Sequence, residues 1–373
     1  MGTSSESRAN VSPLLSAEIA WRDRYEMLES HGYRLRPRYH PNWRPSWLDT
    51  KRPVSHHEDY NIHNNLFNMD AIRVSDGRKV FLKRVRSGSR EIDILRFLSE
   101  PERLQDPNNH AAALLDVFTD DNDPRFSYMV MPLLRPYYYP DFYSVDEVVE
   151  FMRQLLQGLC YMHELSVAHR DCSELNLMMD AEAMYPKGFH PATFTTDGSG
   201  YNRAYPKRRR DVKDLRYYFI DFGISSIFGP DEPRKVLGVD GQDDEVPELS
   251  LDVPYDPFLV DVFILGNLFR KAFLNRYTNL DFLLPLVERM TTRDCRERLT
   301  SFSALRLFDV LVSNQSWYTL RWGLKEKESG LITHFFQDVG SVTRESVNLA
   351  KNVLGKKSRN MARALLRSWR SEN

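Results

Sequence analysis

One stretch of the chain constrains its fold more than any other: an apolar-faced helix that leads directly into a polar loop. Ser144 and Glu147 have the spacing of a helix-capping box, and apolar residues then recur at helical spacing. These residues are Val148, Phe151, Leu155, Leu159 and Met162. The loop that follows reads SVAHRDCSELNLMMD, with polar residues between apolar flanks. Because such placement is typical of a catalytic loop on a rigid core, we predict a mostly buried helix that presents functional groups at its end.

The composition and charge of the chain exclude several classes of protein. With 42% apolar and 28% charged residues among 373, the chain can bury a large core, which excludes collagen, mucin and wholesale disorder. Its 51 Lys and Arg residues almost balance its 52 Asp and Glu residues, giving a formal charge of −1. This balance is not that of a polybasic nucleic-acid binder, so we expect no nucleic-acid partner.

The cysteines and the apolar segments indicate where the protein resides. Cys160, Cys172 and Cys295 are odd in number and far apart, which argues against disulfide bonds or zinc-ligand spacing and suits a reducing compartment. The N-terminal residues lack the features of a signal peptide. The longest apolar run, 258–269, contains an aspartate and is too short to cross a bilayer. We expect an intracellular, cytoplasmic protein without a transmembrane segment, or a nuclear one if the basic run 207–210 is an import signal.

The chain divides into four parts by composition and periodicity. Residues 1–56, rich in Arg, Pro, Tyr and Trp, are expected to be an N-terminal extension. Residues 57–134 contain strand-like runs, an Asp-Gly turn and one short helix, which predicts a small β-rich lobe. Residues 135–315 are expected to form a helical lobe with an insert at about 181–213. Residues 316–373 are expected to form a helical, basic C-terminal extension.

Three short motifs occur in a fixed order along the chain. The pattern H-R-D-x-x-x-x-N occupies 169–176, D-F-G occupies 221–223 after a strand-like run, and VFLK ends at Lys83 in a predicted strand. In this order and context the chain resembles the eukaryotic protein kinase family, in a divergent form whose motif style is similar to that of fungal members. The likeness covers roughly residues 60–313.

Three further residues extend the likeness. Glu248 ends a V-P-E sequence similar to A-P-E, Asp261 follows it by thirteen positions, and Arg298 fits the arginine that pairs with this glutamate. In protein kinases these residues build the peptide-substrate lobe, which disfavours a small-molecule phosphotransferase of related fold. The resemblance therefore implies transfer of a phosphoryl group to a hydroxyl of a protein substrate, with a preference for serine or threonine.

The resemblance also implies a fold and a nucleotide site. The fold would be α+β and bilobal, with a small β-rich lobe that includes helix αC, a larger helical lobe, and ATP between them. Lys83 would hold the α- and β-phosphates, and Glu91 would orient the lysine. Met131 and Leu133, at the end of the last strand of the small lobe, would contact the nucleotide.

The catalytic loop and the D-F-G motif would supply the metal ligands and the base. Asn176 and Asp221 would provide hard oxygen ligands to Mg²⁺. Asp171 would accept a hydrogen bond from the substrate hydroxyl and take its proton, and Arg170 would bind an anionic group of the activation segment. These roles suit phosphoryl transfer, which depends on positioning and on neutralisation of phosphate charge.

Three departures from the family pattern leave a second function open. No glycine occurs in 56–69, where the family has a G-x-G-x-x-G lid over the phosphates. Phe81 stands where the family has an alanine against the adenine ring, and Ser173 stands where serine/threonine kinases place a lysine. The alternative is a pseudokinase, a binding or scaffolding module with weak or no nucleotide turnover.

The activation segment lacks the usual phosphorylation site. Between Gly223 and Glu248, Ser225 and Ser226 adjoin the D-F-G motif, and no later Ser, Thr or Tyr follows. We hypothesise that a carboxylate of this segment pairs with Arg170 in place of a phosphate. A solvated acidic loop is the open alternative. The candidate carboxylates belong to Asp231, Glu232, Asp240, Asp243, Asp244 and Glu245.

Two other segments have more than one interpretation. The chain places 44 residues between Asn176 and Asp221, far more than a hairpin requires, and we expect this insert to project near the cleft. Its basic run 207–210 either docks an acidic partner or is simply solvated. The last 23 residues carry seven Lys or Arg and one Glu, with apolar residues on one helical side. They are expected either to contact an anionic membrane surface or to pack on the kinase core.

Overall fold

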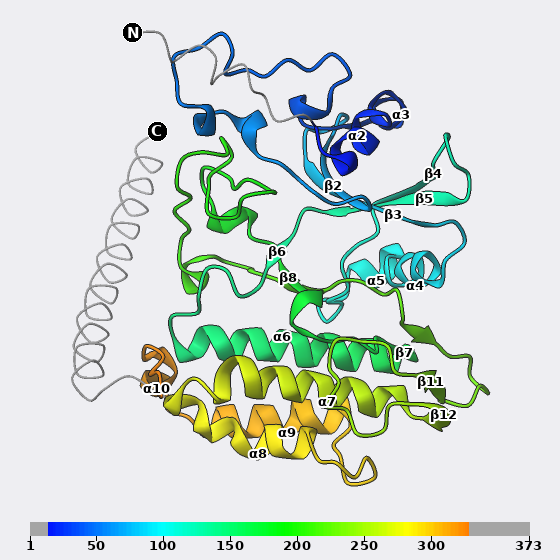
Figure 1. Cartoon of the computed structure of the whole chain (residues 1–373). Coiled ribbons are helices and arrows are strands. Elements are labelled where there is room, and N and C mark those ends of the chain that lie inside the picture. The colour runs from blue at the N-terminus through cyan, green and yellow to red at the C-terminus, as the bar shows by residue number, and fades with distance from the viewer. Residues whose placement is uncertain (1–13, 328–373) are drawn as a thin grey trace, which may run out of the picture.

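The chain folds into two lobes, which a computed structural model describes for residues 14–327 (Figure 1). The small lobe, at the top of Figure 1, is an antiparallel sheet with the strand order β1-β2-β3-β5-β4. Its strands are β1 (Tyr33–Arg34), β2 (Asn68–Arg73), β3 (Lys79–Arg86), β4 (Asp116–Thr119) and β5 (Phe126–Pro132). Its helices are α2 (Ser16–Arg22), α3 (Tyr25–Ser30), α4 (Arg90–Leu98) and α5 (Pro101–Leu104). The predicted α+β, bilobal fold is confirmed.

The hairpin of β2 and β3 decides which side chains face the large lobe. Gly77 in its turn has φ of +72°, a conformation that glycine adopts without strain. The register pairs Phe81 with both Asp70 and Met131, two residues before Lys83. Because directly opposed residues project to one face and the period of a strand is two, all four side chains lie on the same face of the sheet.

The N-terminal segment, expected to be an extension, is folded onto the small lobe from Ser16 onward. Strand β1 pairs with β2, and α2 and α3 lie over the outer face of the sheet. Trp21 and Leu28 are fully buried there, in one core with Leu82 and Val130 of the sheet. Burial of each such side chain stabilises the fold by roughly 1.5–3 kcal/mol. The segment is therefore an integral part of the small lobe.

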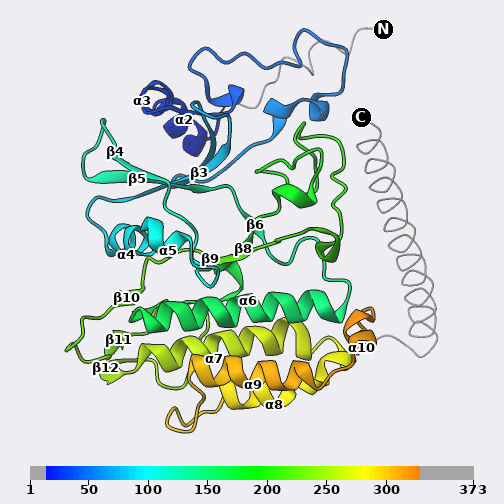
Figure 2. The same cartoon turned by 180° about the vertical axis from the view of Figure 1, so that it is seen from behind.

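The large lobe is a stack of helices, with α6 nearest the small lobe and α7 and α9 beyond it (Figures 1 and 2). The helices are α6 (Val145–Glu164), α7 (Pro257–Phe269) with a π-helical continuation (Arg270–Leu274), α8 (Leu284–Met290), α9 (Ser301–Ser313) and α10 (Trp317–Arg321). Helix α6 begins after Ser144 and is mostly buried, as predicted. The predicted capping box is wrong, because the Ser144 hydroxyl bonds to Asp146 while Glu147 accepts the N–H of Tyr143 at 2.8 Å.

Short strands of the large lobe bring the H-R-D loop and the D-F-G motif together. They are β6 (Arg135–Pro136), β8 (Leu177–Met179) and β9 (Tyr217–Phe219) in one sheet, β7 (Val167–Ala168) with β10 (Ser226–Ile227), and β11 (Val236–Gly238) with β12 (Ser250–Tyr255). Pairing of β8 with β9 places the end of the catalytic loop beside the start of the D-F-G motif.

The insert predicted at 181–213 leaves β8, rises toward the small lobe and returns to β9. In Figure 1 its loops (green) lie beneath residues 35–67, the segment that joins β1 to β2. Of the predicted C-terminal extension, the structure describes α10 and the residues up to 327, and the basic stretch at 351–373 lies outside the described residues. No helix within residues 14–327 is long and apolar enough to span a membrane.

Candidate active site

Lys83 connects the two lobes through its ammonium group. The Nζ atom lies 2.6 Å from Glu91 Oε1 on α4 and 2.9 Å from Asp221 Oδ1 after β9. Burial alone lowers the pKa of Lys83, but the carboxylates of Glu91 and Asp221 outweigh it and the net shift of the pKa is upward. The lysine is therefore held charged, as a phosphate-binding point charge must be.

Asp221 has a strained backbone and one oxygen directed away from Lys83. Its φ is +61°, in the left-handed region that non-glycine residues rarely adopt. Burial raises the pKa of its carboxyl, but Lys83 and the N–H of Gly223 outweigh burial and the net shift is downward. Both contacts are to Oδ1, so Oδ2 remains for a cation.

Asp261 on α7 holds the catalytic loop. Its fully buried carboxylate accepts the backbone N–H of His169 at 2.8 Å and that of Arg170 at 2.5 Å. Arg170 has φ of +69°, a strained conformation that these charge-assisted hydrogen bonds offset. The apolar run at 258–269 thus supplies the anchor of the loop as well as a core helix.

Asp171 and Asn176 are bonded to each other within that loop. The Asn176 amide nitrogen donates to Asp171 Oδ2 at 2.8 Å and to the Asp171 carbonyl at 3.1 Å, which leaves its oxygen for a metal. The Ser173 hydroxyl donates to Asp171 Oδ1 at 2.8 Å. Gln242 of the activation segment also donates to this carboxylate, a contact with no signal in the sequence.

The hypothesis that Arg170 pairs with an acidic side chain is wrong. Its guanidinium donates to the carbonyls of Ile224 and Leu237, both at 3.0 Å, so its donors are satisfied by the backbone. Two of the six acidic residues have other partners: Asp243 accepts from Asn267 at 2.8 Å, and Glu245 pairs with Arg270 and Lys271. The activation segment is nevertheless ordered, because Arg170 ties its start at Ile224 and its middle at Leu237 to the catalytic loop.

The predicted pairing of Arg298 with Glu248 is confirmed. Two hydrogen bonds join the guanidinium to the carboxylate, one of them 3.0 Å long, and Arg298 is only 5% exposed. Arg298 also donates to the Leu259 carbonyl at the start of α7. This bidentate pair fixes the end of the activation segment on the large lobe.

The sheet face above the site carries a polar cluster that no motif in the sequence indicated. Asp70 lies on the same sheet face as Phe81 and Met131 and pairs with Arg36 at 3.1 Å. Arg36 in turn contacts Glu58 at 3.4 Å. An aspartate at an inward position of the strand-like run MDAIRV was the signal that could have revealed a buried partner. Leu133, the other predicted nucleotide contact, is half-buried and packs on the main core.

The place of the glycine-rich lid is taken by residues 35–67, which the insert braces from below. The amide nitrogen of Asn61 donates to the Gly200 carbonyl at 3.1 Å. The amide oxygen of Asn61 accepts from the Thr193 hydroxyl at 2.8 Å. Nearby, buried His190 lies 3.0 Å from Glu58. These contacts span the two lobes, so the insert does project near the cleft and also fixes the segment above it.

The residues present fit Mg²⁺ only together with a nucleotide. Asn176 and Asp221 offer one amide oxygen and one carboxylate oxygen, both of the hard type that Mg²⁺ prefers. Within residues 14–327, no three His, Cys, Asp or Glu side chains are grouped so that they could hold a metal ion by themselves. Phosphate oxygens and waters would have to complete the octahedron, which is usual for this ion.

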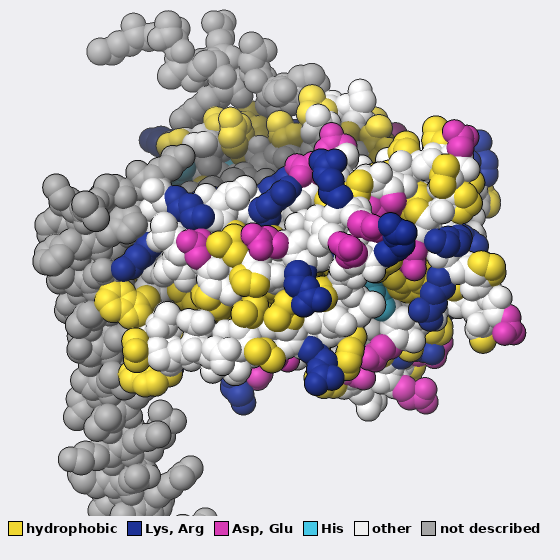
Figure 3. All heavy atoms as spheres, turned by 90° about the horizontal axis from the view of Figure 1, so that it is seen from below, with side chains coloured by type: hydrophobic (Ala, Val, Ile, Leu, Met, Phe, Trp, Pro, Cys, Tyr) yellow, Lys and Arg dark blue, Asp and Glu magenta, His cyan; other side chains and the backbone are white. Residues whose placement is uncertain are grey.

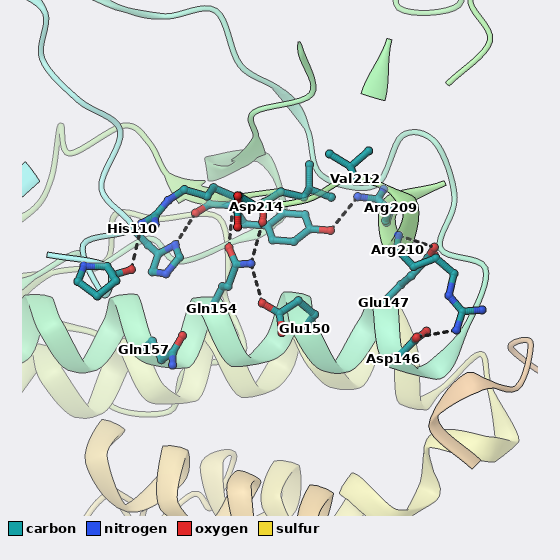
Figure 4. A pocket seen from close by; sticks show the side chains of 14 residues that line it. His110, Asp146, Glu147, Glu150, Gln154, Gln157, Arg209, Arg210, Val212 and Asp214 are labelled. Carbon is teal, nitrogen blue, oxygen red and sulfur yellow. Dashed lines mark hydrogen bonds and ion pairs between the residues drawn. The ribbon is translucent and has the colours of Figure 1, made fainter. Parts of the chain in front are cut away.

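A separate cavity of about 650 Å³ lies between α6 and the end of the insert (Figure 4). Its polar side chains bond to one another: Arg210 pairs with Asp146 at 2.8 Å, and Gln154 bonds to Glu150 and to the backbone of β9. None of the predicted catalytic residues lines it. The hydrogen bonds and ion pair around this cavity hold the insert on α6, and the cavity is not the candidate active site.

Comparisons with known proteins found sequence similarity to several protein kinases. No family model matches the chain. It is similar to a probable casein kinase II subunit alpha homolog of Encephalitozoon cuniculi, with 24% identity over 246 residues, 61% of this chain and 65% of that protein. It is 30% identical over 128 residues to the serine/threonine-protein kinase ppk8 of Schizosaccharomyces pombe, covering 33% of this chain and 19% of that one. A structure of the Rad53 kinase domain with SCD2 aligns at 16% identity and a TM-score of 0.40, over 64% of this chain and 81% of that chain.

The two lobes and the motif residues between them define a protein kinase domain. The similarity to several protein kinases points to the same class. The fold and these similarities, at low identity, support a divergent protein kinase domain in this chain. It spans less than two thirds of the length of the curated relatives described above.

Proposed function

We propose that this protein is an ATP- and Mg²⁺-dependent protein kinase that phosphorylates serine or threonine hydroxyls of a protein substrate. The observation that carries the proposal is the meeting of Lys83, Glu91 and Asp221, from three different elements, within 2.9 Å. The serine/threonine-protein kinase ppk8 among the similar proteins supports the choice of acceptor.

Each residue of the site has a defined task in this reaction. When bound, Mg·ATP supplies the γ-phosphoryl group and the cation neutralises phosphate charge. Lys83 binds the α- and β-phosphate oxygens, and Asn176 and Asp221 direct their remaining oxygens to the cation. Asp171 takes the hydroxyl proton as the acceptor oxygen bonds to phosphorus and the bond to ADP breaks. We expect slow turnover, because Ser173 adds no positive charge and residues 35–67 lack a glycine-rich lid.

Binding and transfer are tested separately. Titration with Mg·ATP should raise the melting temperature of the wild-type protein, because a ligand at 100 times its Kd stabilises the native state by about 2.7 kcal/mol. Asp221→Asn should remove most of the rise, and the control Asp252→Asn, on exposed β12, should keep it. Transfer of the γ-phosphate of labelled ATP to a mixed peptide library should be abolished by Asp171→Asn. Absence of any melting shift in the wild-type protein would refute the proposal.

The second candidate is a nucleotide-binding scaffold that transfers no phosphate. Phe81 on the roof of the site and the braced segment in place of the lid favour it. A melting shift with Mg·ATP without transfer to any peptide or to the chain itself would favour this scaffold over the kinase.

The location and the remaining partners are also proposals. We propose an intracellular protein, cytoplasmic or nuclear, because its three cysteines are free and burial raises the pKa of Cys160 to about 11, which keeps that thiol unreactive. On the face shown in Figure 3, Lys and Arg side chains are interspersed with Asp and Glu, which supports the absence of a nucleic-acid partner. Peripheral membrane contact of residues 351–373 stays a prediction, and co-sedimentation with anionic liposomes tests it.

A further inference from the structure

The carboxylate of Asp171 already accepts four hydrogen bonds. Oδ1 accepts from the Ser173 hydroxyl at 2.8 Å and from the backbone N–H of Gln242 at 3.0 Å. Oδ2 accepts from Asn176 at 2.8 Å and from the side-chain amide of Gln242 at 3.2 Å. An ionised carboxylate offers about four lone-pair sites, so all of them are occupied and a substrate hydroxyl has none to use.

Gln242 covers Asp171 from the solvent side. Gln242 is exposed, whereas Asp171 beneath it is only 8% exposed. The preceding Gly241 has φ of +122°, and a Cβ atom there would lie 3.4 Å from the Arg170 carbonyl. That distance is an ordinary van der Waals contact, so the positive φ, and not lack of space, is what favours glycine at this position. On the other side, buried Asp243 fixes the backbone through Asn267.

The side chain of Gln242 is the donor that can leave most easily. Its bond to Oδ2 is the longest of the four, and only the side chain has to move, because the backbone N–H stays on Oδ1. A cavity of about 200 Å³ adjoins Gln242, with Ile264 and Leu268 on its apolar side and Glu174 at its exposed rim. A rotated amide can enter that cavity, and Glu174, which also lines it, is the acidic residue there that could accept from the amide.

We propose that Gln242 is a resident competitor of the substrate hydroxyl and a positioning residue for the catalytic aspartate. Its backbone N–H orients the Asp171 carboxylate, and its side-chain amide occupies the acceptor site that the hydroxyl must take. The substrate binds productively only after the amide has turned out of that site. This inference rests on the proposed kinase function, since it assigns the acceptor side of the same reaction.

Gln242→Ala tests the competition because it removes the side-chain donor and keeps the backbone donor. We expect kcat/KM for a peptide substrate to rise about tenfold, in line with the loss of one competing charge-assisted hydrogen bond, while KM for ATP is unchanged. Val239→Ala, an exposed neighbour in the same segment, should behave as the wild type. A lower or unchanged kcat/KM in Gln242→Ala would overturn the competition, because a purely structural contact predicts a loss of kcat.

Chemical labelling provides a readout that does not depend on activity. Carbodiimide coupling of glycine ethyl ester to Asp171, followed by mass spectrometry, should proceed severalfold faster in Gln242→Ala than in the wild type or Val239→Ala. Equal labelling in all three proteins would show that the amide does not cap the carboxylate. Faster labelling of Gln242→Ala, without phosphate transfer by any of the three proteins, would refute the kinase function. The hydrogen bond from the Gln242 amide to Asp171 would then be a structural contact only.

Discussion

At the scale of the residue, buried groups that must stay neutral or paired set the response of the protein to pH. His110 is 2% exposed, lies in the connection between α5 and β4, and bonds through Nδ1 to the Tyr217 carbonyl of β9 at 2.8 Å. Burial lowers the pKa of His110 to about 4, from an ordinary value of 6.5. Between these values the unfolded chain binds more protons than the native one, so stability falls as the pH falls through this window.

The wild type should therefore lose on the order of 3 kcal/mol of unfolding free energy through His110 between pH 7 and pH 4. His110→Gln should remove this part of the pH dependence, although it lowers the stability at neutral pH. The exposed His56→Gln serves as the control and should retain the wild-type slope. Urea unfolding at several pH values measures this pH dependence of the unfolding free energy. Identical slopes for wild type and His110→Gln would contradict the assignment.

At the scale of the element, the insert and residues 35–67 act as one brace across the lobes. Asn61 is its central contact, with hydrogen bonds to Gly200, Thr193 and the Glu58 carbonyl. Periodicity along the chain predicted helix α6 and the β2–β3 hairpin, because each is determined by residues close in sequence. The path of the insert was not predictable in the same way, because its partners lie more than 130 positions away.

Asn61→Ala should loosen the brace and lower the unfolding free energy by about 1–3 kcal/mol, because it leaves buried polar groups without partners. Limited proteolysis should then cut the insert at 187–205 faster than in the wild type. Asn64→Ala, an exposed asparagine of the same segment, is the matched control and should change neither property. A proteolysis rate equal to that of the control would mean that the insert is held by other contacts.

At the scale of the whole molecule, the N-terminal helices support the sheet that carries Lys83. Trp21 is fully buried on the outer face of the sheet, and its indole N–H donates to the Asn65 carbonyl at 2.6 Å. The sheet thus has one core against α2 and α3 and another toward α4 and the large lobe. If the proposed nucleotide binds on the lower face of the sheet, we expect its affinity to depend on packing on the upper face.

Trp21→Ala should destabilise the protein by about 3–5 kcal/mol, as large-to-small changes of buried aromatic residues do. It should also weaken Mg·ATP binding measured by isothermal titration, because β3 and Lys83 lose their support. Ile19→Ala on the exposed side of α2 is the control and should change little. Unchanged Mg·ATP affinity in Trp21→Ala, at a temperature where the variant remains folded, would show that the packing of α2 and α3 does not affect the nucleotide site.

The sequence by itself predicted helix α6 and the β2–β3 hairpin from local periodicity, and its ordered motifs, through their resemblance to protein kinases, pointed to the two-lobed fold and to Lys83, Glu91 and Asp221. Only the tertiary structure decided what Arg170 binds, that the N-terminal segment completes the small lobe, and that Gln242 reaches Asp171. Those contacts join residues far apart in the chain through backbone carbonyls, amides and apolar faces. Such groups occur at nearly every position, so their partners are fixed by packing geometry and not by a pattern that can be read along the chain.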